Sequence, residues 1–69
     1  MNNKFGETLR SFREEKQMTQ QVLATICNTT KYSISAWELG KQEPNIDMIL
    51  KLADFFDVTV GQLLGTEEY

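Results

Sequence analysis

The sequence predicts an all-α fold, a single small domain of five helices. Apolar residues recur every three or four positions along most of the chain, and no segment alternates apolar and polar residues as a strand would. A threonine or asparagine stands before four of the apolar segments, where it can cap a helix, and Gly40 and Gly65 follow two of them as stop signals. A chain of 69 residues has the length of one domain, so we take residues 1–69 as that domain.

The first two helices are expected over residues 5–17 and 20–27. In the first, apolar side chains share one face at positions i, i+4 and i+7, and Met18 is expected to close the same core. These side chains are Phe5, Leu9 and Phe12. Thr19 can cap the second helix, and Asn28 suits a left-handed turn at its end. The inner face of the second helix holds Leu23, Ala24 and Cys27.

The third helix is expected over residues 31–39, with Thr29 or Thr30 as its N-cap. Ile34 and Trp37 lie three positions apart and should face the core. The opposite side of this helix is then left to Lys31, Tyr32, Ser35 and Ala36.

The fourth helix has the most regular apolar spacing in the chain. Asn45 can cap it, and Asp47 suits the positive end of the helix dipole. The spacing i, i+3, i+4, i+7 and i+10 predicts a core face made of Ile46, Ile49, Leu50, Ala53 and Phe56.

A last short helix is expected to run through Leu63 and Leu64. Thr59 and Gln62 have the spacing of a capping box, which predicts where this helix begins. Residues 66–69 should form a frayed C-terminal tail.

The composition argues against several classes of protein. Cys27 is the only cysteine and histidine is absent, so neither a disulfide nor the usual ligands of a structural zinc site are available. No apolar run approaches the roughly 18 residues of a membrane span, and a lone cysteine suits a reducing, cytoplasmic setting. There is no Ser/His/Asp or Cys/His set and no glycine-rich phosphate loop, so we expect no enzyme, cofactor or metal.

The charges are unevenly distributed along the chain. A net charge of -3 and a pI of 4.7 argue mildly against nucleic acid. However, residues 1–45 hold six basic and five acidic side chains, whereas residues 46–69 hold one lysine and five carboxylates. A DNA-binding face in the first part would be close to neutral, which predicts modest affinity and a shallow dependence on salt.

The most specific pattern lies within residues 19–44. It reads T-Q-x-x-L-A, then a turn-like Asn-Thr-Thr, then S-x-W-E-x-G-K-x-x-P. Two short helices joined by a tight turn are the layout that presents one helix to a DNA major groove.

With this motif the chain resembles the Cro and lambda-type phage repressors, the XRE family of helix-turn-helix proteins. Other matching pairs along the chain are Arg13-Glu14, Ile34-Ser35, Leu52-Ala53 and Leu63-Leu64. The resemblance covers residues 5–64 and implies a five-helix, lambda-repressor-like DNA-binding domain. Its helix-turn-helix would span residues 19–39, with the third helix in the major groove of double-stranded DNA.

The resemblance also implies roles for single residues. Gln20 corresponds to a glutamine that contacts a phosphate and can brace the recognition helix. Arg13 and Glu38 correspond to a pair that ties the first helix to the end of the third. Positions that face base edges are matched by Lys31, Tyr32 and Ala36, and positions near the DNA backbone by Thr30, Ser35 and Lys41. Leu39 stands where the family often has Arg or Asn, so one phosphate contact is missing.

Several of these side chains have a competing structural interpretation. Tyr32 could offer its hydroxyl or ring to DNA, or it could be partly buried against the second helix. Lys31, Gln20 and Lys41 could contact DNA or simply be solvated. Trp37 is expected in the core rather than at the interface, and Cys27 as an inert core residue.

We therefore expect a DNA-binding transcription regulator of bacterial or phage origin, and most simply a repressor. One recognition helix reads only about 3–5 base pairs, so a homodimer on a pseudo-palindromic operator is expected. The apolar residues proposed for the dimer surface are Val58, Val60, Leu64, Phe55 and Tyr69. The alternative is a protein-interaction module of the same fold, antitoxin-like or antirepressor-like, with weak or no DNA binding. Leu39 and the acidic residues 46–69 motivate this alternative.

Overall fold

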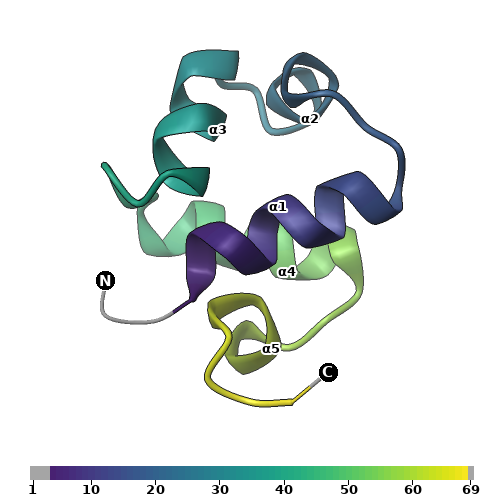
Figure 1. The fold of residues 1–69 in the computed structure, drawn as a ribbon, viewed down its shortest axis with the longest axis vertical. Helices are drawn as coiled ribbons and strands as arrows, with labels where there is room; N and C mark the ends of the chain where they lie inside the picture. Colours follow the sequence, from purple (N-terminus) through teal and green to yellow (C-terminus); the bar gives the residue numbers. More distant parts are fainter. Residues whose placement is uncertain (1–3, 69) are drawn as a thin grey trace.

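The computed structural model describes residues 4–68, and this part of the chain contains five helices and no strand (Figure 1). The helices are α1 (Phe5–Glu15), α2 (Gln20–Ile26), α3 (Lys31–Glu38), α4 (Ile46–Phe56) and α5 (Val60–Leu64). The predicted all-α, five-helix fold is therefore confirmed. In Figure 1, α1 and α4 cross the middle of the molecule, with α2 and α3 toward one end and α5 toward the other. Contacts join α2 to α3, α1 to both α3 and α5, and α4 to α5.

Polar caps start four of the helices, as the sequence predicts. Each capping side chain accepts a hydrogen bond from the backbone N–H three residues further on: Thr19 from Val22, Thr30 from Ser33, Asn45 from Met48 and Thr59 from Gln62. The capping box at Thr59 is complete, because the Gln62 side chain also accepts from the Thr59 N–H at 2.9 Å. These caps satisfy backbone donors that have no partner within a helix.

The first three helices end one or two residues earlier than predicted. The turns that follow them place Gln17, Asn28 and Gly40 in the left-handed region, with φ of 56°, 57° and 74°. A left-handed residue ends the helical hydrogen-bond pattern. The sequence indicates this role for Asn28 and Gly40, whereas glutamine gives no such signal at position 17.

One apolar core joins all five helices. Its buried members are Phe5, Leu9, Phe12, Leu23, Ala24, Cys27, Ile34, Trp37, Ile49, Leu52, Ala53, Phe56 and Leu63. The predicted core faces of α1, α2 and α3 are confirmed, and Met18 packs against the cluster. The rings of Phe12 and Phe56 stack with centroids 5.7 Å apart, which joins α1 to α4.

The predicted core face of α4 is partly wrong. Ile46 and Leu50 are 64% and 52% exposed, whereas Leu52 is fully buried. The buried positions of α4 are Ile49, Leu52, Ala53 and Phe56. This helix has apolar residues on more than one side. The predicted face, which includes Ile46 and Leu50, is therefore rotated about the helix axis relative to the face that is buried.

The expected frayed tail is also wrong for residues 66–68, which fold back onto α5. The backbone N–H groups of Thr66 and Glu67 donate to the Gly61 carbonyl, at 2.9 and 3.2 Å. The Thr59 hydroxyl donates to the Glu67 carboxylate, and the Gln62 side chain donates to the Glu68 carbonyl at 3.2 Å. The segment after Gly65 is thus held by α5, while Tyr69 lies outside the described residues.

A glycine sets the approach of α1 to α3. A Cβ atom on Gly6 would lie 2.5 Å from the Glu38 carbonyl oxygen and 2.7 Å from that of Trp37. Both are backbone atoms, so a larger residue would force the two helices apart. The N-terminal turn of α1 therefore rests directly on the end of α3.

Candidate nucleic-acid interface

A tight turn sets the angle between α2 and α3. The Thr29 N–H donates to the Ala24 carbonyl at 2.9 Å, and Asn28 supplies the left-handed residue that this closure needs. Ala24 is completely buried, and its short side chain takes little room where the two helices meet. The two helices form the predicted helix-turn-helix, with Ile34 and Trp37 of α3 turned into the core.

Glu38 joins three helices through hydrogen bonds. Arg13 of α1 donates from Nε to Glu38 Oε2 at 2.7 Å and from Nη2 to Oε1 at 3.1 Å. Gln20, at the start of α2, donates from Nε2 to the same Oε1 at 3.0 Å. Arg13 also donates from Nη1 to the Met18 carbonyl at 2.7 Å, so the turn between α1 and α2 joins the network.

This Glu38 network is shielded from solvent. The Arg13 side chain is 11% exposed and that of Glu38 only 3%. The hydrogen bond to Glu38 raises the pKa of the Arg13 guanidinium, and this effect exceeds the opposing effect of burial. A bidentate, partly desolvated pair has a defined geometry, so it fixes α3 relative to α1 and α2.

The outward side of α3 begins with two exposed side chains. Tyr32 is 74% exposed, which excludes its burial against α2. Lys31 is also exposed, and its Nζ lies 5.4 Å from the centre of the Tyr32 ring. This cation–π contact holds an ammonium donor beside an aromatic ring at the start of α3.

The other predicted contact residues on this side lie along α3 and at its two ends. Ser35 and Ala36 are half-buried on the outward side of α3, and Lys41 is exposed in the loop after it. The Lys41 N–H donates to the Ala36 carbonyl at 2.9 Å, which ties that loop to the helix end. Thr30 Oγ1 accepts the Ser33 N–H at 3.2 Å, so its first role is to cap α3.

Gln20 also has a structural role, since its amide nitrogen binds Glu38. It stands at the first position of α2, where the helix dipole and unpaired N–H groups favour an anion. The amide nitrogen has a second hydrogen, so it can bind Glu38 and still donate to another acceptor.

Two structural roles were not predicted from the sequence: the close approach at Gly6 and the hydrogen bond that the Met18 carbonyl accepts. A glycine inside an amphipathic helix is a signal of close packing, and Gly6 fits that signal. The Met18 carbonyl had no signal, because any residue supplies the same backbone acceptor.

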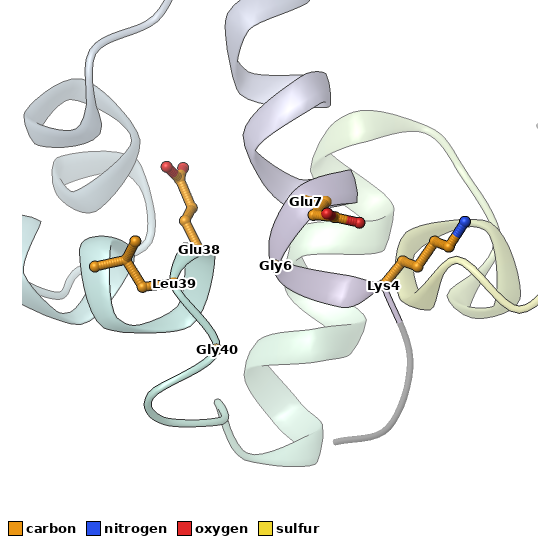
Figure 2. Close-up of a pocket in the computed structure, with 6 residues that line it drawn as sticks. All are labelled: Lys4, Gly6, Glu7, Glu38, Leu39 and Gly40. Atoms are coloured by element: carbon orange, nitrogen blue, oxygen red, sulfur yellow. The ribbon is translucent and has the colours of Figure 1, made fainter.

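A small hollow lies where the start of α1 meets the end of α3 (Figure 2). It is lined by Lys4, Gly6, Glu7, Glu38, Leu39 and Gly40. Its volume of about 140 Å³ is well below the several hundred Å³ of a typical ligand site, so we assign no ligand to it. Figure 2 shows the Glu38 and Leu39 side chains leaving the end of α3 in different directions. Leu39 is 63% exposed, whereas Glu38 is shielded by its bonds to Arg13.

Residues 4–68 contain neither a metal-binding cluster nor a membrane-spanning helix. No group of His, Cys, Asp and Glu side chains in this part of the chain could hold a metal ion. None of its helices has the length and apolar character needed to cross a bilayer.

Comparison with known sequences identifies the domain. The sequence profile of a family described as helix-turn-helix matches residues 9–63, the segment that runs from α1 to α5. The chain belongs to this helix-turn-helix family. It is the family of DNA-binding transcription regulators that the motif of residues 19–44 indicated.

The helix-turn-helix domain has curated relatives with different regulatory roles. It is 39% identical over 64 residues to the HTH-type transcriptional activator BcrR of Enterococcus faecalis, a match to 93% of this chain and 31% of BcrR. It is 30% identical over 64 residues to the cryptic phage CTXphi transcriptional repressor RstR of Vibrio cholerae, covering 93% of this chain and 58% of RstR. The chain thus spans from about a third to somewhat over half of these relatives.

Solved structures share the same helical arrangement. The P22 c2 repressor in complex with a synthetic operator matches at a TM-score of 0.84 and 27% identity, over 91% of this chain and 96% of the repressor. The restriction-modification controller protein C.AhdI from Aeromonas hydrophila matches at a TM-score of 0.77 and 32% identity, over 87% of each chain. HppE, solved with iron(II) in complex with a substrate, matches at a TM-score of 0.82 and 26% identity, over 93% of this chain and 37% of HppE.

Proposed function

We propose that this domain binds double-stranded DNA sequence-specifically by placing α3 in the major groove, and that it regulates transcription as a repressor. The observation that carries the proposal is the outward side of α3, which presents Lys31 and Tyr32 on a helix whose inner side is fixed by the Glu38 network. Similarity to a repressor that was solved on its operator supports the same orientation.

Each contact residue has a chemical role in this proposal. Lys31 donates to guanine O6 or N7, and the Tyr32 ring and the Ala36 methyl contact thymine methyl groups. The contacts near the DNA backbone come from Gln20, Thr30, Ser35 and Lys41. Leu39 is 63% exposed at the position where an Arg or Asn would reach a phosphate, so few phosphates are neutralised and the salt dependence is shallow.

The proposal includes a dimer on an inverted repeat. Half-sites in this type of operator lie roughly 34 Å apart. The domain measures 27 Å along its longest axis, so one copy is too short to read two half-sites. Repression then follows when a dimer covers a promoter.

A selection experiment tests this function. The purified chain is incubated with a randomised duplex library at low salt, and the retained DNA is sequenced. We expect an enriched inverted repeat. A folded protein that enriches no sequence would contradict the proposal and favour the protein-interaction module.

A pair of variants then tests the interface on the enriched operator. Lys31→Ala should weaken binding about 10-fold, because it removes a donor to a base edge. Arg10→Ala is the matched control, since Arg10 is an exposed cation on α1, outside the proposed interface. Fluorescence anisotropy measures both, and equal losses of affinity would exclude a specific role for Lys31.

A promoter fusion carrying this operator should lose expression when the protein is present, and a gain of expression would contradict repression.

A further inference from the structure

The surface of α4 carries an apolar strip that the core does not use. Ile46 and Leu50 are 64% and 52% exposed. They stand four positions apart, so they are neighbours on one side of the helix. Among the described residues from 46 onward, they are the large apolar side chains that the domain leaves exposed.

The apolar residues expected at the dimer surface have another role. Phe55, Val58, Val60 and Leu64 are partly buried and pack against the core of their own chain. They therefore stabilise the monomer, and each leaves a smaller fraction of its surface exposed than Ile46 or Leu50 does. Within residues 46–69, Ile46 and Leu50 therefore offer a second copy of the chain more exposed apolar surface than those four residues do.

Charges of both signs flank this strip. Asp47 and Lys51 are exposed on the same helix and are also four positions apart. When two copies of α4 pair antiparallel in the register whose two-fold axis is level with position 49, Asp47 lies level with the partner's Lys51 and Lys51 with the partner's Asp47. In the same register Leu50 packs between the partner's Ile46 and the partner's Leu50. The strip is therefore complementary to itself in both charge and apolar character, as a two-fold interface requires.

A third carboxylate fits this register. Asp54, also exposed on α4, comes level with the N-terminal end of the partner's α4. A carboxylate is favoured there because a helix N-terminus carries partial positive charge.

We infer that the strip of Ile46, Asp47, Leu50 and Lys51 docks a second copy of this chain through antiparallel pairing of the two α4 helices. This inference rests on the proposed function, since it supplies the dimer that an inverted repeat needs. Two apolar side chains per copy cover far less than the roughly 1,200–2,000 Å² of a stable interface. The dimer is therefore weak in solution and forms on adjacent half-sites, where the effective concentration is high.

A charge exchange tests the pairing without DNA. Asp47→Lys places like charges opposite each other in its own homodimer, and so does Lys51→Asp. Mixing these two variants restores both opposite-charge contacts in a heterodimer. Sedimentation equilibrium at high concentration should show each variant associating at least 10-fold more weakly than the unchanged chain, with association recovered in the mixture. A mixture that associates no better than the separate variants would overturn the inference.

A second pair of variants leaves Asp47 in place, because Asp47 also stabilises the first turn of α4. The double variant Ile46→Ala/Leu50→Ala removes the apolar strip, and Val22→Ala/Ile26→Ala removes exposed apolar carbons from α2 as the matched control. Circular dichroism confirms that both are folded. We expect the α4 variant to lose about 10-fold in self-association and the α2 variant to associate like the unchanged chain. Equal behaviour of the two double variants would overturn the inference.

Binding to the selected operator separates this inference from the proposed function. The α4 double variant should bind an isolated half-site normally and lose cooperative binding to the full repeat. Unchanged cooperativity would overturn the docking surface and leave DNA binding intact. Failure of the unchanged chain to bind either DNA, together with self-association through α4, would overturn the proposed function and leave the docking surface.

Discussion

The two parts of this domain are held together by different kinds of interaction. Helices α1, α2 and α3 share the apolar core but are also joined by directional hydrogen bonds to Glu38. Helices α4 and α5 pack through apolar side chains, and α5 is closed by the Thr59 capping box and the segment folded back on it. Apolar packing is non-directional, whereas hydrogen bonds specify an angle. The comparison indicates that the geometry of α3 is fixed most tightly where DNA recognition is proposed.

The largest expected effect comes from breaking the Glu38 network. Glu38→Ala leaves the shielded Arg13 guanidinium without its partner and frees Gln20, which should lower the free energy of unfolding by about 3 kcal/mol. For a domain of this size the melting temperature should fall by roughly 12–24 °C. Arg13→Ala should act in the same direction.

Thermal melting followed by circular dichroism measures this effect. Glu14→Ala is the control, because its pair with Arg10 is exposed and contributes little. A Glu38→Ala melt that matches the control would show that the network does not hold the first part together.

The next effect tests the close contact of α1 with α3. Gly6→Ala would push a methyl group against the Trp37 and Glu38 carbonyl oxygens, which should cost about 2 kcal/mol and tilt α3. Gly40→Ala is the matched comparison, because its Cβ meets no atom within 4 Å and only its φ of 74° is unfavourable. It should cost about 1 kcal/mol. Urea unfolding measures the free energy of unfolding of both variants. A smaller loss for Gly6→Ala than for Gly40→Ala would contradict the close packing of α1 on α3.

A smaller effect is expected in the second part. Thr59→Ala removes the cap of α5 and its bond to Glu67, which should cost about 1 kcal/mol. DNA affinity should stay unchanged, since α5 is remote from the outward side of α3. Melting curves and anisotropy on the selected operator measure both quantities. A loss of affinity in a fully folded Thr59→Ala protein would show that the two parts are coupled more closely than their contacts indicate.

The smallest effect is a pH dependence at Cys27. Burial raises the pKa of this thiol above its ordinary value, and nearby Lys51 opposes the shift. The stabilisation is therefore present below the unfolded pKa of about 8.5 and is lost as pH rises toward the folded value, because the unfolded thiol ionises first. The free energy of unfolding should fall between pH 7 and pH 10 in both proteins. The fall should be larger for the unchanged chain than for Cys27→Ala. Parallel losses in the two proteins would contradict this origin.

Local signals account for most of what the sequence could predict. The caps at Thr19, Thr30, Asn45 and Thr59 have short-range chemistry that is visible in the sequence, so every capped helix begins at the predicted residue. The core faces of α1, α2 and α3 follow from the spacing of their apolar residues. In α2 the spacing selects the buried side even though Val22 and Ile26 leave apolar carbons exposed on the other side.

The misses depend on contacts between distant residues. The orientation of α4 is set by its packing in the core, which buries Leu52 and leaves Leu50 exposed. The spacing of apolar residues could not select this face, because α4 carries apolar residues on more than one side. The bond from the Thr66 N–H to the Gly61 carbonyl belongs to the left-handed turn that Gly65 signals. The bonds of residues 67 and 68 to Thr59 and Gln62 follow from no local pattern. A tyrosine at position 32 could have been exposed or partly buried against α2. The structure leaves it 74% exposed.

The separation of the two sides of α3 has a consequence for evolution and engineering. Ile34, Trp37 and Glu38 hold the helix from within, while Lys31 and Tyr32 project away from the domain. Exchanging the projecting residues removes little packing, so it should leave stability almost constant. A library randomised at those two positions should therefore yield mostly folded proteins with new operator preferences, and paralogous regulators could diverge in the sequences they read while keeping one scaffold.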